Sequence, residues 1–230
     1  MPAVLSRLRT DGVSSDLQLP VDTVLDLRIF ARRAQCYGNV ERQFPFKLRD
    51  RVHAEAHYGQ AFAHAGYLHD DLTHCSSAVR LASDPLLLAL AQAYLQGAPV
   101  YRGLSLRWSF ATASRDAKSA IDLESLGDRP VDYAGVTFVF NLTDVRDPND
   151  ALVFVAKSHR RMCPSQAEFP AQALLALRHT PALRPLTGDA GAGFVIDALG
   201  MSWTQRPTER DRLILLLSYA LNDYGIWEAF

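Results

Sequence analysis

The 230-residue sequence lacks a charge bias, a long apolar run and a cysteine motif. Its 24 Lys and Arg residues nearly balance 25 Asp and Glu residues, so the net charge of −1 favours neither nucleic acid nor an anionic membrane as a partner. The apolar runs are too short to cross a bilayer. Cys36, Cys75 and Cys163 form neither a CxxC pair nor a zinc-binding spacing. Since Met1–Pro20 also has no apolar stretch typical of a secretion signal, we expect a cytoplasmic protein with reduced thiols and no membrane contact.

Histidine is absent from two long parts of the chain. None occurs between His74 and His159, and none follows His179. This absence excludes imidazole, the commonest metal ligand and a frequent general acid or base, from those segments. The seven histidines are His53, His57, His64, His69, His74, His159 and His179.

Apolar spacing predicts that the first part of the chain is mostly helical. Val21–Ala34 has apolar residues at helical spacing. Pro85–Leu95 follows a Ser-Asp capping signal and precedes Gly97, which is a stop signal. Arg51–His64 is also predicted to be a helix.

The second part changes to strand patterns. Pro99–Phe110 alternates, and Gly135–Leu142 places alternate apolar residues on one face. Arg212–Ala220 is apolar on both faces, as a central strand should be. Helices followed by many short strands predict an α+β protein with a sandwich or a barrel. Further strands are expected at Ala151–Ala156 and Gly193–Asp197, turns at Asp147–Asp150 and Gly188–Gly193, and a short helix at Ala171–Leu177.

Six short segments also occur in a recognisable order. They are Leu81–Pro85, Trp108–Phe110, Phe140–Val145, Val153–His159, Phe194–Asp197 and Asp211–Leu215. Together they resemble the phytanoyl-CoA dioxygenase family of Fe(II)/2-oxoglutarate oxygenases. The resemblance covers most of the chain and implies a mainly β core, a cupin-like jelly roll or double-stranded β-helix, with N-terminal flanking helices. A single domain is expected, with residues 1–98 as a mostly helical flank and residues 99–230 as the jelly-roll core.

The resemblance also shows where the chain departs from the family. The family binds iron through a His-x-Asp/Glu motif and a distal His, which leave open positions for 2-oxoglutarate and oxygen. Ser202 stands opposite the distal His, and Ser114 and Asp116 stand opposite the proximal motif. Asp122–Glu124 and Gly127–Asp128 are alternative alignments for that motif. Because neither segment contains a histidine, the resemblance implies a scaffold without its iron ligands, and we expect no metal and no cofactor.

Of two further family positions, one is retained in this sequence and one is changed. Arg212 stands where the resemblance implies an arginine that binds the distal carboxylate of 2-oxoglutarate. A buried arginine requires an anionic partner, and an internal ion pair with Asp197 or Asp144 is the alternative. The family motif PGSH is changed to Ala156–His159. Because Lys157 replaces its glycine, we expect this loop to have a different shape.

Several residues are candidates for a substrate site. The large aromatic residues suit the lining of an apolar pocket, although plain core packing is the alternative. Acid–base groups and shape would carry any catalysis without iron. The expected catalytic residues are Asp116 as base, Tyr133 and Ser202 as hydrogen-bond donors and Arg212 as anion anchor, and the expected substrate-binding residues are Ser114, Trp108, Trp203 and Arg212.

The leading functional hypothesis is a metal-independent enzyme of secondary metabolism that acts on a small organic molecule. Its step would be redox-neutral: cyclisation, isomerisation, elimination or hydrolysis. One alternative is a working Fe(II)/2-oxoglutarate oxygenase that recruits His159 or an N-terminal histidine together with Asp116. Another is a non-catalytic or small-molecule-binding protein. His53 and His57 have a spacing that can bind metal, but ordinary helix histidines explain the pair more simply.

Overall fold

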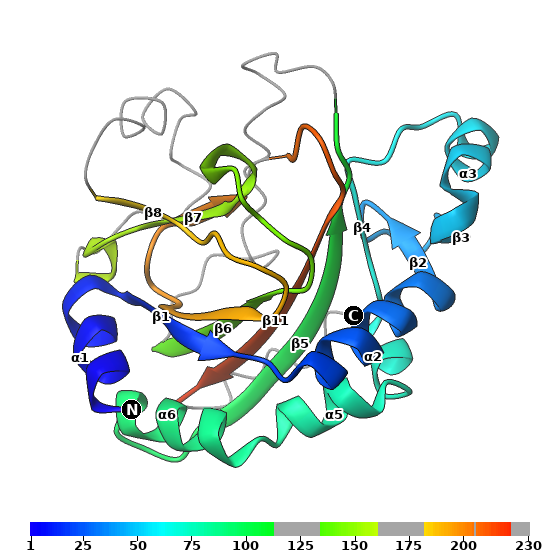
Figure 1. Cartoon of the computed structure of the whole chain (residues 1–230). Helices are drawn as coiled ribbons and strands as arrows, with labels where there is room; N and C mark the ends of the chain where they lie inside the picture. Colours follow the sequence, from blue (N-terminus) through cyan, green and yellow to red (C-terminus); the bar gives the residue numbers. More distant parts are fainter. Residues whose placement is uncertain (113–133, 161–181, 205, 222–230) are drawn as a thin grey trace.

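The computed structural model describes residues 1–112, 134–160, 182–204 and 206–221 (Figure 1). Two β-sheets and a layer of helices make up this part of the chain. The helices are α1 (Pro2–Asp11), α2 (Val21–Arg33), α3 (Arg51–Tyr58), α4 (His69–Leu72), α5 (Ser76–Ala82) and α6 (Pro85–Leu95). The strands are β1 (Val13–Gln18), β2 (Gln35–Gly38), β3 (Pro45–Lys47), β4 (His64–Gly66), β5 (Val100–Ser109), β6 (Gly135–Asn141), β7 (Leu152–Val155), β8 (Leu183–Pro185), β9 (Ala192–Asp197), β10 (Ser202–Thr204) and β11 (Arg212–Ala220).

The large sheet has eight strands in the order β1-β9-β6-β11-β5-β4-β2-β3, and the small sheet has the order β10-β7-β8. All strand pairs in both sheets are antiparallel. This is the mainly β, cupin-like jelly roll that the sequence predicted. β11 lies between β6 and β5, so its apolar residues on both faces are buried, as expected of a central strand.

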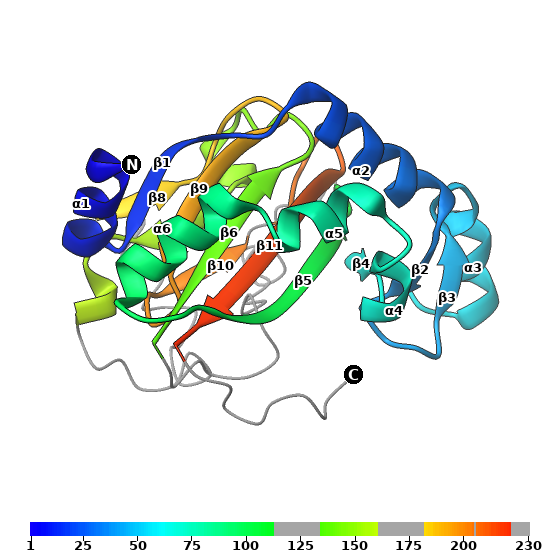
Figure 2. The same cartoon turned by 90° about the horizontal axis from the view of Figure 1, so that it is seen from below.

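The helix layer covers one face of the large sheet, as Figure 2 shows for α2, α5 and α6. Alternate residues of the central strands, such as Leu213 and Leu215 of β11, pack with Leu27 of α2 and Leu90 of α6 in the largest apolar cluster. We call this the outer face of the large sheet. The opposite, inner face meets the small sheet. There Ile214 of β11 belongs to a second apolar cluster, together with Val139, Leu152, Phe154 and Leu216.

Local signals explain most of the helix ends. The Asp84 side chain accepts from the backbone N–H groups of Leu86 and Leu87, so α6 begins where its capping signal predicted. α6 ends in a left-handed residue at Gln96, one position before the glycine expected to stop it. The predicted Arg51–His64 helix was too long. α3 ends before Gly59, which adopts a left-handed conformation with φ 64°, and His64 already begins β4.

The first 98 residues contribute more than a helical flank. They supply all six α-helices of the described chain, but they also supply β1 to β4, which extend the large sheet at both ends. β1 pairs with β9, and β4 pairs with β5. Of the described helices, none is long and apolar enough to span a membrane. The predicted helix Ala171–Leu177 lies outside the described residues.

Candidate functional site

A row of polar residues crosses three neighbouring strands on the inner face of the large sheet. In strand register, His64 of β4 pairs with Ser109 of β5, and Ser109 pairs with Arg212 of β11. Paired residues of antiparallel strands point to the same face. Since Ala65 and Leu213, the next residues along, pack in the outer cluster, His64, Ser109 and Arg212 point inward.

Arg212 is fixed in this row by neighbours from two directions. Its side chain is only 2% exposed. One guanidinium nitrogen donates to the backbone carbonyl of Asp150, and another donates to Ser109 Oγ at 3.1 Å. The Asp150 carboxylate accepts from the backbone N–H of Thr208 at 3.2 Å, which ties the loop before β11 to the same place. Arg212 therefore has the burial expected of an anion anchor.

The two carboxylates named as ion-pair partners for Arg212 have other partners in the structure. Asp197 accepts from the hydroxyl of Tyr94 and from the backbone N–H of Leu199 at 2.7 Å. Asp144 accepts from the backbone N–H of Ala190 and lies 3.6 Å from the guanidinium of Arg146. Both carboxylates therefore have hydrogen-bond or ion-pair partners other than Arg212.

A second arginine lies on the same face. Arg107 of β5 pairs with Ile214, which belongs to the inner cluster, so the Arg107 side chain also points inward. Its Nε donates to Ser105 Oγ at 3.0 Å, and Arg107 is partly buried. Two guanidinium groups on the inner side of β5 and β11 form a positively charged part of this face. Opposite charge on a ligand would be favoured there.

Ser202 reaches the inner face from the small sheet. It pairs with Phe154 of β7, a member of the inner cluster, and Thr204 pairs with Leu152 of the same cluster. Ser202 is 9% exposed, and among the described residues no hydrogen-bond partner of its hydroxyl is found. The position that the resemblance assigns to a metal-binding histidine is therefore turned inward and carries a hydroxyl.

The two tryptophans expected to bind substrate point away from this face. Trp203 pairs with Val153 and packs with Val155 and Met201 in a third apolar cluster on the other side of the small sheet. Trp108 lies in the outer cluster under the helices, where its Nε1 donates to the Tyr67 hydroxyl at 3.0 Å. Each tryptophan occupies the alternate position of its strand, and a role for either in substrate binding stays a prediction. Both side chains are core residues.

Three other predicted site residues, Ser114, Asp116 and Tyr133, lie outside the described residues. Of the predicted set, the structure places Ser202 and Arg212 on facing inner surfaces. Sequence reasoning missed Arg107 and Ser109 as members of this face. The alternation of Pro99–Phe110 contained the signal, because Ser105, Arg107 and Ser109 alternate with apolar residues that pack under the helices.

The polar groups on the inner face are poorly suited to iron. In the described ranges, no group of three His, Cys, Asp or Glu side chains is placed to hold a metal ion. The inner face offers hydroxyl groups (Ser109, Ser202, Thr204), guanidinium groups (Arg107, Arg212) and one imidazole, His64. A facial triad needs two imidazoles and a carboxylate.

His159 lies beside the end of α1. Its Nε2 lies 3.3 Å from the backbone carbonyl of Arg9 in α1, and its ring lies against Gly12 at the end of that helix. The loop that carries His159 keeps a tight turn although Lys157 replaces the glycine of the family motif PGSH. Lys157 adopts φ 67°, the left-handed conformation that favours glycine, so the expected change of loop shape is not found at this residue.

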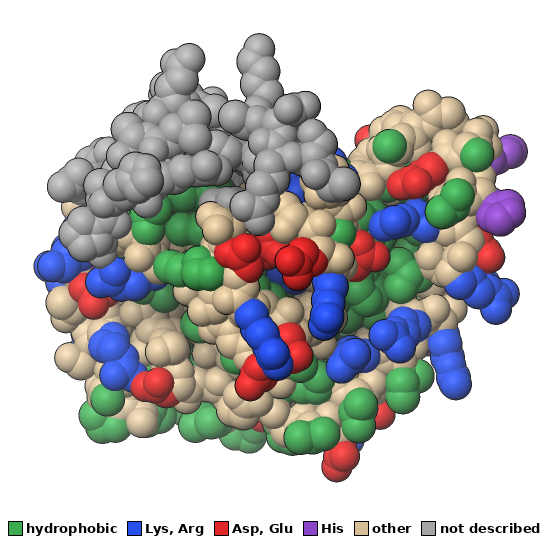
Figure 3. All heavy atoms as spheres, turned by 45° about the horizontal axis from the view of Figure 1, so that its top comes forward, with side chains coloured by type: hydrophobic (Ala, Val, Ile, Leu, Met, Phe, Trp, Pro, Cys, Tyr) green, Lys and Arg blue, Asp and Glu red, His purple; other side chains and the backbone are tan. Residues whose placement is uncertain are grey.

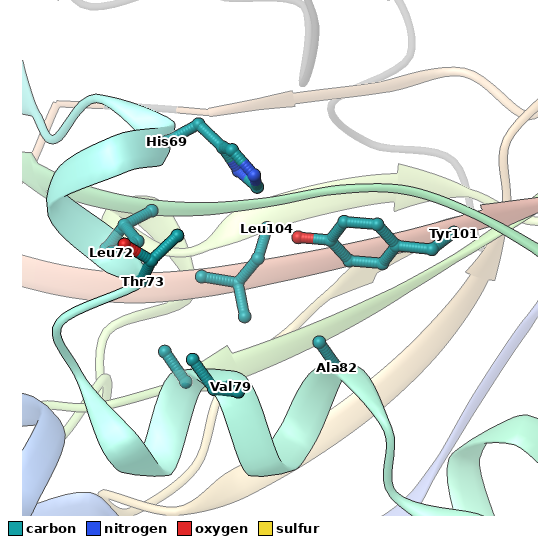
Figure 4. A pocket seen from close by; sticks show the side chains of 8 residues that line it. His69, Leu72, Thr73, Val79, Ala82, Tyr101 and Leu104 are labelled. Atoms are coloured by element: carbon teal, nitrogen blue, oxygen red, sulfur yellow. The ribbon is translucent and has the colours of Figure 1, made fainter.

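Neither of two pockets that the described residues form is on the inner face. One, of about 200 Å³, lies on the helix side of β5 and is lined by His69 and Tyr101 among others (Figure 4). The other lies along α1 and is lined by residues of that helix. Figure 3 shows a face on which acidic and basic side chains adjoin one another, and its described part has no extended area of one charge sign.

Solved structures with a similar fold are known. No protein-family model matches the chain, and no curated protein matches it. AviO1 from Streptomyces viridochromogenes is 17% identical, with a TM-score of 0.61 over 95% of this chain and 94% of that chain. HygX from Streptomyces hygroscopicus, with nickel, 2-oxoglutarate and hygromycin B bound, is 18% identical, with a TM-score of 0.64 over 96% and 87%.

A third similar structure is SnoN, the non-haem α-ketoglutarate-dependent epimerase of nogalamycin biosynthesis, at 16% identity and a TM-score of 0.61, covering 95% of this chain and 82% of that chain. The chain therefore shares the fold of these three structures. At these identities the likeness establishes the fold and leaves the activity of this chain open.

Proposed function

We propose that this chain is a metal-independent enzyme that uses the 2-oxoglutarate oxygenase fold to act on a small organic molecule. The observation that carries the proposal is Ser202. It lies on the inner face, at the place that the resemblance gives to the distal histidine, and the segment that should hold the proximal histidine contains none. A serine hydroxyl is a poor ligand for iron compared with imidazole.

Retained polar groups support a reused site. Arg212 and Arg107 would anchor an acidic group of the substrate, because guanidinium groups bind carboxylates and phosphates through paired hydrogen bonds. Ser202 and Tyr133 would donate hydrogen bonds, and Asp116 would act as the base. His64, in the same row as Arg212, adds an imidazole, a side chain that can act as a hydrogen-bond donor or acceptor.

Such groups suit redox-neutral chemistry, in which a proton is moved and no oxidant is consumed. Cyclisation, isomerisation, elimination and hydrolysis fall in this class. HygX was solved with hygromycin B bound, and SnoN belongs to nogalamycin biosynthesis. We therefore place this chain in a biosynthetic route to a secondary metabolite, with a cytoplasmic location and a small-molecule substrate.

One observation weighs against the oxygenase alternative. His159, the histidine that it would recruit, is packed against the end of α1 and contacts the Arg9 carbonyl. A non-catalytic binding protein is the second candidate. It is favoured by the burial of Arg212, Ser109 and Ser202, which the enzyme hypothesis requires a substrate to reach.

Metal and cosubstrate measurements test the proposal directly. The purified chain is incubated anaerobically with Fe(II) and 2-oxoglutarate, and bound iron is measured after desalting. Oxygen is then admitted and succinate is quantified. We expect substoichiometric iron and no succinate above a protein-free control. One iron per chain, together with succinate formation, would show a working oxygenase and refute the proposal.

Restoring the two histidines tests the position of the lost ligands. In the double variant Ser114→His/Ser202→His, with Asp116 unchanged, we expect measurable iron binding. Thr204→His in place of Ser202→His is the matched control, because Thr204 lies on the same strand and faces the same side. Equal iron binding in the two double variants would refute the assignment of Ser202.

A further inference from the structure

An apolar stripe is exposed on α2, in the helix layer and away from the inner face of the large sheet. Val21, Leu25 and Ile29 are 73%, 47% and 48% exposed. Each is four residues from the next, so the three side chains lie along one side of the helix. In the described part of the chain, no other helix carries more than one exposed large apolar side chain. Single exposed apolar residues are ordinary, but an aligned group of three is typical of a surface that contacts another protein.

A different side of α2 attaches the helix to the rest of the chain. Val24, Leu27 and Ala31 are at most 5% exposed, because they pack in the outer cluster. Figure 2 shows α2 along the outside of the helix layer, with α5 next to it. There the Ser77 hydroxyl of α5 donates to the Asp26 carboxylate of α2 at 2.9 Å. The helix thus has two apolar sides, and the fold of one chain buries only one of them.

The charges beside the stripe are divided between the two ends of α2. Asp22 lies in the first turn, and Arg32 and Arg33 lie in the last turn. All three are exposed, and none has an ion-pair partner among the residues that the structure describes. Asp22 and Arg33 are separated by about three helical turns, so they lie on the same side of the stripe. Each charge suits the helix dipole, and together they make the surface complementary to itself when two copies of α2 lie antiparallel.

We propose that a second copy of this chain docks on this stripe, with the two α2 helices antiparallel about a two-fold axis between Leu25 and Ile29. Leu25 of each copy then packs against the partner's Ile29, and Asp22 lies opposite the partner's Arg33. A helix of this length is only about 20 Å long. The interface is therefore small, and we expect a reversible dimer with a dissociation constant in the micromolar range. The dimer does not involve the inner face, so the proposal is independent of the reaction proposed above.

Sedimentation velocity across the micromolar range of protein concentration tests the dimer directly. We expect a monomer–dimer equilibrium for the wild-type chain. Leu25→Glu places a charge in the middle of the stripe and should raise the dissociation constant by about tenfold or more. Val52→Glu is the matched control, since Val52 is 68% exposed on α3, and it should leave the equilibrium unchanged. Ile29→Gln adds no charge and should also weaken the dimer. Circular dichroism should show both stripe variants folded, because both side chains are about half exposed in the single chain.

Charge reversal tests the antiparallel arrangement. Asp22→Lys and Arg33→Glu should each weaken the dimer, because like charges then meet across the two-fold axis. The double variant should restore the wild-type dissociation constant. A parallel pair would bring Asp22 against the partner's Asp22, so a double variant without restoration would overturn the proposal. A chain that stays monomeric at every concentration would also overturn it, and so would a dimer that Leu25→Glu leaves intact, because that dimer would use another surface.

Discussion

Trp108 provides the sharpest test of how the two faces of the large sheet are assigned. Its indole N–H donates to the Tyr67 hydroxyl, which in turn donates to the backbone carbonyl of Ala31. Ala31 lies in the last turn of α2, where carbonyl groups have no partner within the helix. Burial raises the pKa of Tyr67, so its hydroxyl stays protonated and able to donate. Trp108 thus helps to fasten a helix end to the sheet.

The magnitude of a Trp108→Phe substitution follows from two losses. The hydrogen bond to Tyr67 contributes about 1 kcal/mol. The smaller ring leaves a cavity in the outer cluster that costs roughly another 1 kcal/mol. We expect the free energy of unfolding to fall by about 2 kcal/mol in urea titrations followed by far-ultraviolet circular dichroism.

A double-mutant cycle with Tyr67→Phe identifies the hydrogen-bonded pair. Each single variant should be destabilised, and the double variant should be less destabilised than the sum, by about 1 kcal/mol. A Trp108→Phe variant within about 0.5 kcal/mol of the wild type would refute the packing argument, since that is the range of surface substitutions. Full additivity with Tyr67→Phe would refute the bond between them.

Three further outcomes are expected. Burial raises the pKa of the Asp197 carboxyl, so the stability that its protonated form contributes is complete at acid pH and is lost as the pH rises through the raised pKa. The free energy of unfolding of the wild type should therefore fall between about pH 4 and pH 8 in urea titrations, and that of Asp197→Asn should fall less. Burial likewise raises the pKa of the Cys36 thiol to about 12, and a thiol reagent at mildly alkaline pH should leave Cys36 unmodified in the folded chain but label it after denaturation, as mass spectrometry of peptides would show. Lys157→Gly should raise the melting temperature slightly, because a left-handed conformation costs a non-glycine residue about 1 kcal/mol, and an unchanged or lower value would mean that the Lys157 side chain stabilises the turn.

The fold class and the longer elements could be predicted from the sequence because they depend on local patterns. β11 is apolar on both faces and is central, and α6 begins at its Asp84 cap. The short strands β2, β3 and β4 had no comparable signal. They are three or four residues long and are stabilised by pairing with each other and with β5. Such pairing depends on distant partners, so a local pattern does not reveal it.

By itself the sequence determined that no histidine lies between His74 and His159 or after His179, and that conclusion required only a count along the chain. The tertiary structure decided which face each side chain serves. Strand register turned Ser202 and Arg212 inward and turned Trp108 and Trp203 into core packing, and it brought His64 into the row of Arg212. A shift of one residue in a strand exchanges its faces, so only the hydrogen-bonded pairing could make that distinction.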